Sequence, residues 1–278
     1  MLTAVKCIPA KGKGKGRVTA VTSLGDDLFV MRLGSKTVEV YDAESLSLQR
    51  EIEVRELGSC CWGLAACSHH QCLYVSDTDN DSVHRAELAA SNALTKWSVS
   101  SVPRGLSSAK QPKGLSVNEA RNVLVACHNA KRIQEHRTNG DLVREINLRA
   151  GVTSPWHAVQ LSSGHYVVSQ NSSPGVVCVI KADGQVVHTC KCEAGMNLMY
   201  PTSVAVKKND MIYVADSAND RILTMDSSLK SMKELTLRAD DASIHRPSGL
   251  CLDESRGRLY VGEYSGSYRV LVVDSVKL

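Results

Sequence analysis

The chain has 278 residues, enough for one large all-β domain or two domains of average size. Apolar residues make up 43% and aromatic residues only 4%, so a core would be built mainly from Val, Leu, Ile and Ala. The net charge of +4 permits an anionic partner without demanding one. Residues 1–16 lack the apolar core of a secretion signal, and no apolar run approaches the length of a membrane helix. With ten scattered cysteines read as reduced thiols, we expect a cytoplasmic protein without a membrane partner.

A short marker recurs along the chain. In order it reads VTAVTSL from Val18, CWGLAAC from Cys61, PKGLSV from Pro112, PWHAVQL from Pro155, PTSVAV from Pro201 and PSGLCL from Pro247. Measured at the third residue of each copy, the spacings are 43, 51, 43, 46 and 46 residues. A period of about 40 to 50 residues indicates a propeller or a solenoid.

Each copy divides into short apolar or alternating runs separated by turn residues, a pattern that predicts β-strands. In the fifth copy these runs are TSVAVKK, MIYVADS, RILTMDS and MKELTLR. Asn139-Gly140 and Asp183-Gly184 separate the third and fourth runs of copies three and four, where a tight hairpin needs positive φ angles. No long helical periodicity lies between the runs, which disfavours a βα solenoid. The sequence therefore predicts an all-β, six-bladed β-propeller of four-stranded antiparallel blades.

We expect a single propeller domain over residues 1–278, with blades at about 18–54, 61–99, 112–148, 155–192, 201–237 and 247–278. The last copy ends one strand short, and a spare strand, residues 2–9, precedes the first copy. This N-terminal strand is predicted to complete the last blade and close the ring, because closure leaves no strand edge open at the seam.

The fifth copy resembles an NHL repeat. The residues that carry the resemblance are Pro201, Val204–Val206, Ile212–Asp216, Asn219, Arg221 and Ile222. NHL repeats form six-bladed propellers, often at the C-terminus of tripartite-motif ubiquitin ligases. The resemblance covers all six copies unevenly, and it implies a propeller that binds the substrate or partner of such a ligase. A RING-type Cys/His spacing, which would catalyse ubiquitin transfer, is absent from the sequence.

The position of Asp216 varies between copies. It is occupied by Arg32, Asp77, Cys127, Gln170 and Glu263 in the other five. Short polar side chains at this point can hydrogen-bond the turn into the third strand, and Asp216 is close enough in sequence to pair with Arg221. We interpret these residues as mainly structural.

Catalytic groups are sparse, and the chain is predicted not to be an enzyme and to use no metal or cofactor. Residues lining a propeller channel come mainly from the first strand of each unit, and those strands contain one histidine, His157, whereas zinc needs three or four protein ligands. The group Cys67, His69, His70 and Cys72 matches no familiar zinc spacing. GKGKG at residues 12–16 lacks the flanking elements of a phosphate loop. A metal-dependent lyase or hydrolase, as some propellers of this shape are, is the least favoured reading.

Binding is expected on the face that carries the loops between second and third strands and between blades. Basic and aromatic residues are predicted to gather there: Lys11, Lys13, Lys15, Arg17, Lys36, Trp62, Lys113, Lys131, Arg132, Trp156, His157, Arg221, Arg246 and Tyr264. The first hypothesis is a protein substrate or scaffold bound by a monomeric propeller. The alternative is single-stranded RNA, whose phosphates and bases suit cations beside flat rings. Acidic residues on the same loops suit a protein at least as well: Asp77, Asp79, Asp81, Asp216, Asp220 and Glu263.

Overall fold

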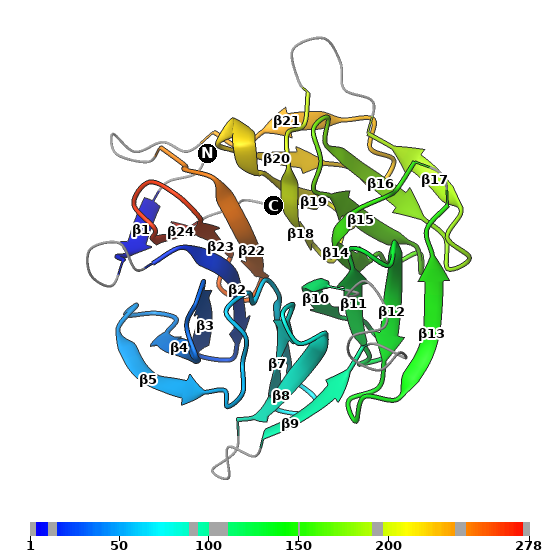
Figure 1. The fold of residues 1–278 in the computed structure, drawn as a ribbon. Coiled ribbons are helices and arrows are strands. Elements are labelled where there is room, and N and C mark those ends of the chain that lie inside the picture. Colours follow the sequence, from blue (N-terminus) through cyan, green and yellow to red (C-terminus); the bar gives the residue numbers. More distant parts are fainter. Residues whose placement is uncertain are drawn as a thin grey trace.

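The computed structural model describes residues 4–10, 16–88, 94–99, 111–149, 151–190, 197–236 and 243–274. They contain twenty-four β-strands and one short 3-10 helix, η1 (Ser217–Asn219). The strands form six four-stranded antiparallel sheets arranged as blades around a common centre (Figure 1). The predicted all-β, six-bladed propeller is confirmed. No helix in the described ranges is long and apolar enough to cross a membrane.

In blades 1 to 5 the four strands follow one another from the centre outward in chain order, and in blade 6 the outermost strand is β1. Blade 1 contains β2 (Val18–Leu24), β3 (Asp27–Arg32), β4 (Thr37–Asp42) and β5 (Leu48–Glu53). Blade 2 contains β6 (Leu64–Cys67), β7 (Cys72–Asp77), β8 (Ser82–Glu87) and β9 (Leu94–Ser98). Blade 3 contains β10 (Pro112–Val117), β11 (Val123–Cys127), β12 (Arg132–His136) and β13 (Leu142–Asn147). Blade 4 contains β14 (Pro155–Gln160), β15 (Tyr166–Gln170), β16 (Val176–Ile180) and β17 (Val186–Thr189); blade 5 contains β18 (Pro201–Val206), β19 (Ile212–Asp216), β20 (Arg221–Met225) and β21 (Met232–Glu234); blade 6 contains β22 (Pro247–Asp253), β23 (Arg258–Glu263), β24 (Val270–Asp274) and β1 (Ala4–Ile8). The predicted hairpin glycines Gly140 and Gly184 have φ angles of +93° and +81°.

The core lies between blades rather than inside them. Each of the six apolar clusters joins residues of two neighbouring blades; Met31 of blade 1 and Val75 of blade 2, for example, belong to one cluster. The few large rings are concentrated in the second strands, where Phe29, Tyr74 and Tyr213 are almost completely buried. A second strand that is apolar on both faces needs a blade on either side, so the packing itself requires a closed ring.

The ring closes where the sequence predicts. β1 pairs with β24 in antiparallel register, from Ala4 opposite Asp274 to Ile8 opposite Val270, so the two ends of the chain share blade 6 (Figure 1). A second connection joins blade 6 directly to blade 1. There Arg258 of β23 donates to the Ala43 carbonyl of blade 1 at 2.7 Å and pairs with Asp274 at 2.6 Å.

Removing residues 1–9 is expected to lower the midpoint of thermal unfolding by at least about 5 °C. The deletion takes Ile8 from the cluster between blades 6 and 1 and leaves β24 paired on one edge only, with β23. Loss of one buried Ile alone typically costs about 2–5 kcal/mol, and 1 kcal/mol shifts the midpoint of a large domain by roughly 2 °C or more. Circular dichroism melts would measure the change, with removal of residues 1–3 as the control. An unchanged midpoint would mean that β1 does not hold the ring closed.

Candidate binding site at the channel mouth

The inner strands share a local irregularity at the start of the repeated marker. In β2, β10, β14, β18 and β22 the pairing with the next strand shifts register just after the first marker residue. Such a bulge leaves one residue unpaired and re-aims its side chain. That second marker residue is Thr19, Lys113, Trp156, Thr202 or Ser248 in these five strands, and Trp62 is its counterpart in blade 2, where β6 begins at Leu64. It lies on the face that carries the loops between blades, here called the loop face.

Small hydroxyl residues occupy this position in three blades and have a structural role. Thr202 donates to the Pro247 carbonyl at 3.1 Å, and Ser248 donates to the Val18 carbonyl at 2.5 Å. Each of these two hydrogen bonds fastens one blade to the next. Thr19 donates within its own blade, to the Met31 carbonyl at 3.3 Å. All three hydroxyls are buried and already donate to backbone carbonyls, so they have no free donor to offer a partner.

Blades 2, 3 and 4 carry large side chains at the same position, and these side chains meet. The ring centroids of Trp62 and Trp156 are 5.2 Å apart, in an edge-to-face arrangement. Tyr264, the residue directly after β23, stacks on Trp62 at 5.5 Å. The three rings come from blades 2, 4 and 6, which alternate around the ring, so they can meet only over its centre.

Three cationic or titratable side chains complete this group. Lys113 places its ammonium 4.9 Å from the ring centre of Trp156 and 5.6 Å from that of Trp62. Arg17 lies 5.1 Å over the Tyr264 ring and donates to its hydroxyl at 3.3 Å. The His128 ring is edge-on to Trp156 at 5.6 Å. Arg17, Trp62, Lys113, His128, Trp156 and Tyr264 are called the mouth cluster below.

Lys113 is the unusual member of the mouth cluster. Its side chain is only 7% exposed, and within the described residues its ammonium forms no hydrogen bond or ion pair. Burial lowers the pKa of Lys113, although the nearby Cys60 and Asp79 favour its charged form. Burial also lowers the pKa of His128, and the positive charge of Lys113 acts in the same direction. The cluster therefore holds a largely buried lysine whose ammonium lies between two indole rings.

Replacing Lys113 with Met is expected to raise the free energy of unfolding near neutral pH. Met has similar length and removes a buried charge whose unmet hydrogen bonds cost about 1–3 kcal/mol. Because burial lowers the pKa of Lys113 in the folded state, that cost is full below the folded pKa, declines as the pH rises from there toward the ordinary pKa of lysine, and is absent above it. Denaturant titrations of both proteins at several pH values would therefore show an advantage for Lys113→Met that shrinks in alkaline solution. An advantage that grows with pH would contradict this account.

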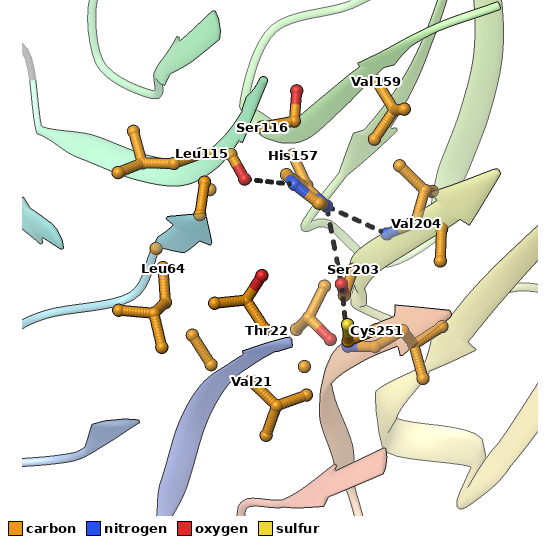
Figure 2. A pocket seen from close by; sticks show the side chains of 18 of the residues that line it. Val21, Thr22, Leu64, Leu115, Ser116, His157, Val159, Ser203, Val204 and Cys251 are labelled. Atoms are coloured by element: carbon orange, nitrogen blue, oxygen red, sulfur yellow. Dashed lines mark hydrogen bonds between the residues drawn. The ribbon is translucent and has the colours of Figure 1, made fainter. Parts of the chain in front are cut away.

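Beneath the mouth cluster lies the central channel. Its cavity of about 210 Å³ is lined by inner-strand residues of all six blades, among them Thr22, Ser116, His157, Ser203 and Cys251 (Figure 2). The prediction that first strands supply the channel lining is confirmed. Most of these side chains are small or apolar.

His157 joins three blades across the channel wall. Its Nε2–H donates to the Leu115 carbonyl of blade 3 at 3.0 Å, and its Nδ1 accepts the Val204 N–H of blade 5 at 3.2 Å (Figure 2). Burial lowers the pKa of His157, which keeps the imidazole neutral. Both nitrogens are thus occupied by backbone groups, and this residue belongs to the channel wall rather than to the mouth cluster.

The histidines and cysteines of the β6–β7 turn do not converge on one point. Cys67 lies 3.2 Å from His70 Nδ1, whereas His69 accepts a hydrogen bond from Arg121 at 2.9 Å. No group of three or more metal-ligating side chains is found within the described ranges. The turn position between first and second strands is as the sequence predicts.

The residues at the Asp216 position hold the loops of the previous blade. Asp216 accepts the Met199 N–H at 2.7 Å and pairs with Arg221 at 2.8 Å. Asp77, Gln170 and Glu263 likewise accept backbone N–H groups from the segment that enters their blade, namely those of Gly58, Thr153 and His245. Arg32 reverses the polarity and donates to the Gly16 carbonyl at 2.6 Å. The structural interpretation of this position is therefore correct in these five blades.

Changing Asp216 to Ala is expected to lower the free energy of unfolding by about 3 kcal/mol, the typical effect of removing one partner of a buried, hydrogen-bonded ion pair. Asp216 is fully buried, and its loss leaves the guanidinium of Arg221 without its closest carboxylate. Glu234 is the matched control because it lies 3.8 Å from the same Arg221 but is largely exposed. Its change to Ala should cost less than about 1 kcal/mol. Equal losses in urea titrations of the two variants would count against the assigned role.

The other predicted loop-face residues are dispersed around the mouth cluster. Lys11, Lys13 and Lys15 lie outside the described residues. Arg132 pairs with Glu145 at 2.6 Å, Arg221 is held by Asp216, and Lys36 donates to the Leu57 carbonyl. Lys131 and Arg246 are exposed.

Sequence reasoning missed His128, although a signal was present. It directly follows the second strand of blade 3, as Tyr264 directly follows that of blade 6. Its contact with Trp156 depends on the position of a different blade, which the local sequence does not reveal.

Solved structures with the same fold come from several kinds of protein. Virginiamycin B lyase from Staphylococcus aureus is 10% identical, with a TM-score of 0.70 over 98% of this chain and 99% of its own. Hydrazine synthase from Kuenenia stuttgartiensis is 16% identical, with a TM-score of 0.68 over 96% and 97%. A Bacteroides thetaiotaomicron protein of unknown function is 12% identical, with a TM-score of 0.75 over 97% and 75%. No protein-family model matches the sequence, and no curated protein matches it significantly.

These comparisons change two expectations drawn from the sequence. They establish the propeller fold, but they give no support to the NHL and tripartite-motif assignment. The expectation that the chain is not an enzyme is contradicted, because the similar propellers include lyases and a hydrazine synthase. The inference failed because it judged catalysis from familiar ligand motifs, whereas a propeller collects its functional groups from separate blades.

Proposed function

We propose that this propeller recognises a protein partner on its loop face, with the mouth cluster as the anchor. The observation that carries the proposal is the meeting of Trp62, Trp156 and Tyr264 over the centre of the ring. All three rings are partly exposed. Tryptophan, tyrosine and arginine dominate the binding energy of protein interfaces, especially near the interface centre.

The arrangement of the bulge position supports the same proposal. In blades 1, 5 and 6 a small hydroxyl residue at this position hydrogen-bonds a backbone carbonyl. Folding therefore does not require a bulky ring here. Trp62 and Trp156 place flat surfaces on the loop face that the fold does not need, which is typical of a binding surface.

The resemblance to NHL repeats adds a cellular setting to the proposal. Within a tripartite-motif ubiquitin ligase, the partner bound at this face would be the ligase substrate. The cysteines of the described residues are free thiols and most are buried, which fits the reducing cytoplasm.

Single-stranded RNA is the second candidate, favoured by the cations that lie over the aromatic rings. A chain of phosphates also needs several free cations along its path. Arg132 and Arg221 are already paired with carboxylates, which leaves fewer cations available around the rings. A protein partner, bound by a few aromatic anchors, fits this charge distribution better.

Selection from a random peptide library displayed on phage would test the proposal, with a random single-stranded RNA pool measured in parallel at two salt concentrations. Peptides that bind the wild type should lose about 30-fold or more in affinity when Trp62 and Trp156 are both changed to Ala, the effect of losing at least 2 kcal/mol at a hot spot. Trp97→Phe is the matched control, because Trp97 lies on the outermost strand of blade 2.

Three results would count against a protein partner. These are failure to enrich any peptide, affinity that survives the double Trp change, and RNA binding that is sequence-selective and persists at the higher salt concentration. The last result would favour the RNA candidate. Each variant should first be compared with the wild type by thermal unfolding, so that lost binding is not confused with lost folding.

A further inference from the structure

Lys113 sets the mouth cluster apart from a purely aromatic anchor. It occupies the bulge position between Trp62 of blade 2 and Trp156 of blade 4, so an indole from each neighbouring blade lies against its ammonium. The equivalent hydroxyls of blades 5 and 6 donate to backbone carbonyls of the next blade. The ammonium of Lys113 makes no such bond, and its side chain is more than nine-tenths buried.

A buried ammonium that lacks an acceptor has three N–H groups left to satisfy. Cation–π contact with two rings offsets part of this loss, but it supplies no hydrogen-bond acceptor. An anionic group arriving from outside would find a cation whose stem is buried and whose ammonium is held between two rings and still open to solvent. The ion pair would then form in a partly enclosed site, where attraction between charges is stronger than at an open surface.

The charged groups near Lys113 do not already pair with its ammonium. Asp79 accepts the N–H groups of Ser59 and Cys60 at 2.7 and 3.1 Å and forms no ion pair with Lys113. His128 donates from Nδ1 to the Pro155 carbonyl at 3.3 Å, so it too is oriented by the backbone. Arg17 is exposed and engaged with Tyr264. Lys113 is thus the enclosed cation of the cluster.

We propose that the mouth cluster binds a carboxylate of the protein partner, an Asp or Glu side chain or a chain end, with Lys113 as its ion-pairing residue. The inference rests on the proposed function. One enclosed ammonium suits one carboxylate. The flat faces of Trp62 and Trp156 would contact the apolar carbon atoms of the partner next to that carboxylate. An RNA strand would instead require a row of cations, of which Arg132 and Arg221 are already paired.

Degenerate decapeptide pools, each with one fixed central residue, test this chemistry directly. The fixed residue is Glu, Gln, Asp, Asn or phosphoserine, and binding is measured by fluorescence polarisation. The Glu and Asp pools should bind the wild type at least tenfold more tightly than the Gln and Asn pools. Lys113→Met should abolish this difference and Lys113→Arg should retain it. Lys208→Met, which removes one exposed charge from the opposite face, should leave it unchanged.

Equal binding of the Glu and Gln pools would overturn the carboxylate site while leaving peptide recognition intact. A preference for Glu that survives Lys113→Met would overturn the role of Lys113. Selective binding of the phosphoserine pool, lost in Lys113→Met, would replace the carboxylate with a phosphate.

A measurement on the protein alone separates failure of the site from failure of the proposed function. The chain has three tryptophans, so the tryptophan emission of the Trp97→Phe protein comes only from Trp62 and Trp156. Sodium acetate, titrated against sodium chloride at constant ionic strength, should change this emission in a saturable way that Lys113→Met removes. If no peptide pool binds, such a response would still support a carboxylate site, and a flat titration would overturn it. If Lys113→Met fails to fold, the acetate titration of the Trp97→Phe protein still tests whether the carboxylate site exists.

Discussion

Burial of the second strands between neighbouring blades is the constraint on which this structure depends. Strands such as β7 and β19 are apolar on both faces, so no blade can bury its own core. Every blade needs two neighbours, and the ring must close. The sharing of blade 6 between β1 and β24, with Arg258 reaching across the seam to blade 1, follows from this requirement.

Closure also determines how polar residues are used on the loop face. The end of each second strand meets the segment entering its blade, and a polar side chain there must satisfy backbone groups that the sheet leaves unpaired. Asp216, Gln170 and Arg32 do so with different chemistry, because either an acceptor for an N–H or a donor for a carbonyl completes the contact. A repeat can therefore decay in sequence while its geometry persists.

The channel mouth differs, because the fold places weaker demands on it. A small hydroxyl residue suffices at the bulge position, yet Trp62, Lys113 and Trp156 occupy it in three successive blades. These side chains join Tyr264 in a cluster that combines partly exposed rings with a largely buried lysine. Stability alone does not account for that combination, since burying most of a lysine without an acceptor for its ammonium is costly.

The sequence by itself determined the repeat, the strand order, the closing strand and most members of the mouth cluster. These features depend on local periodicity and on the copy-to-copy position of a residue, which survive in a single chain. Only the tertiary structure decided which candidates meet. It brought Trp62, Trp156 and Tyr264 together from alternate blades, added His128, and placed His157 in the channel wall with both nitrogens occupied. It also paired Arg132 with Glu145, whereas the pairing of Arg221 with Asp216 was already expected from the sequence. Contacts between residues of different blades depend on how the blades are arranged around the axis, and no local pattern encodes that arrangement.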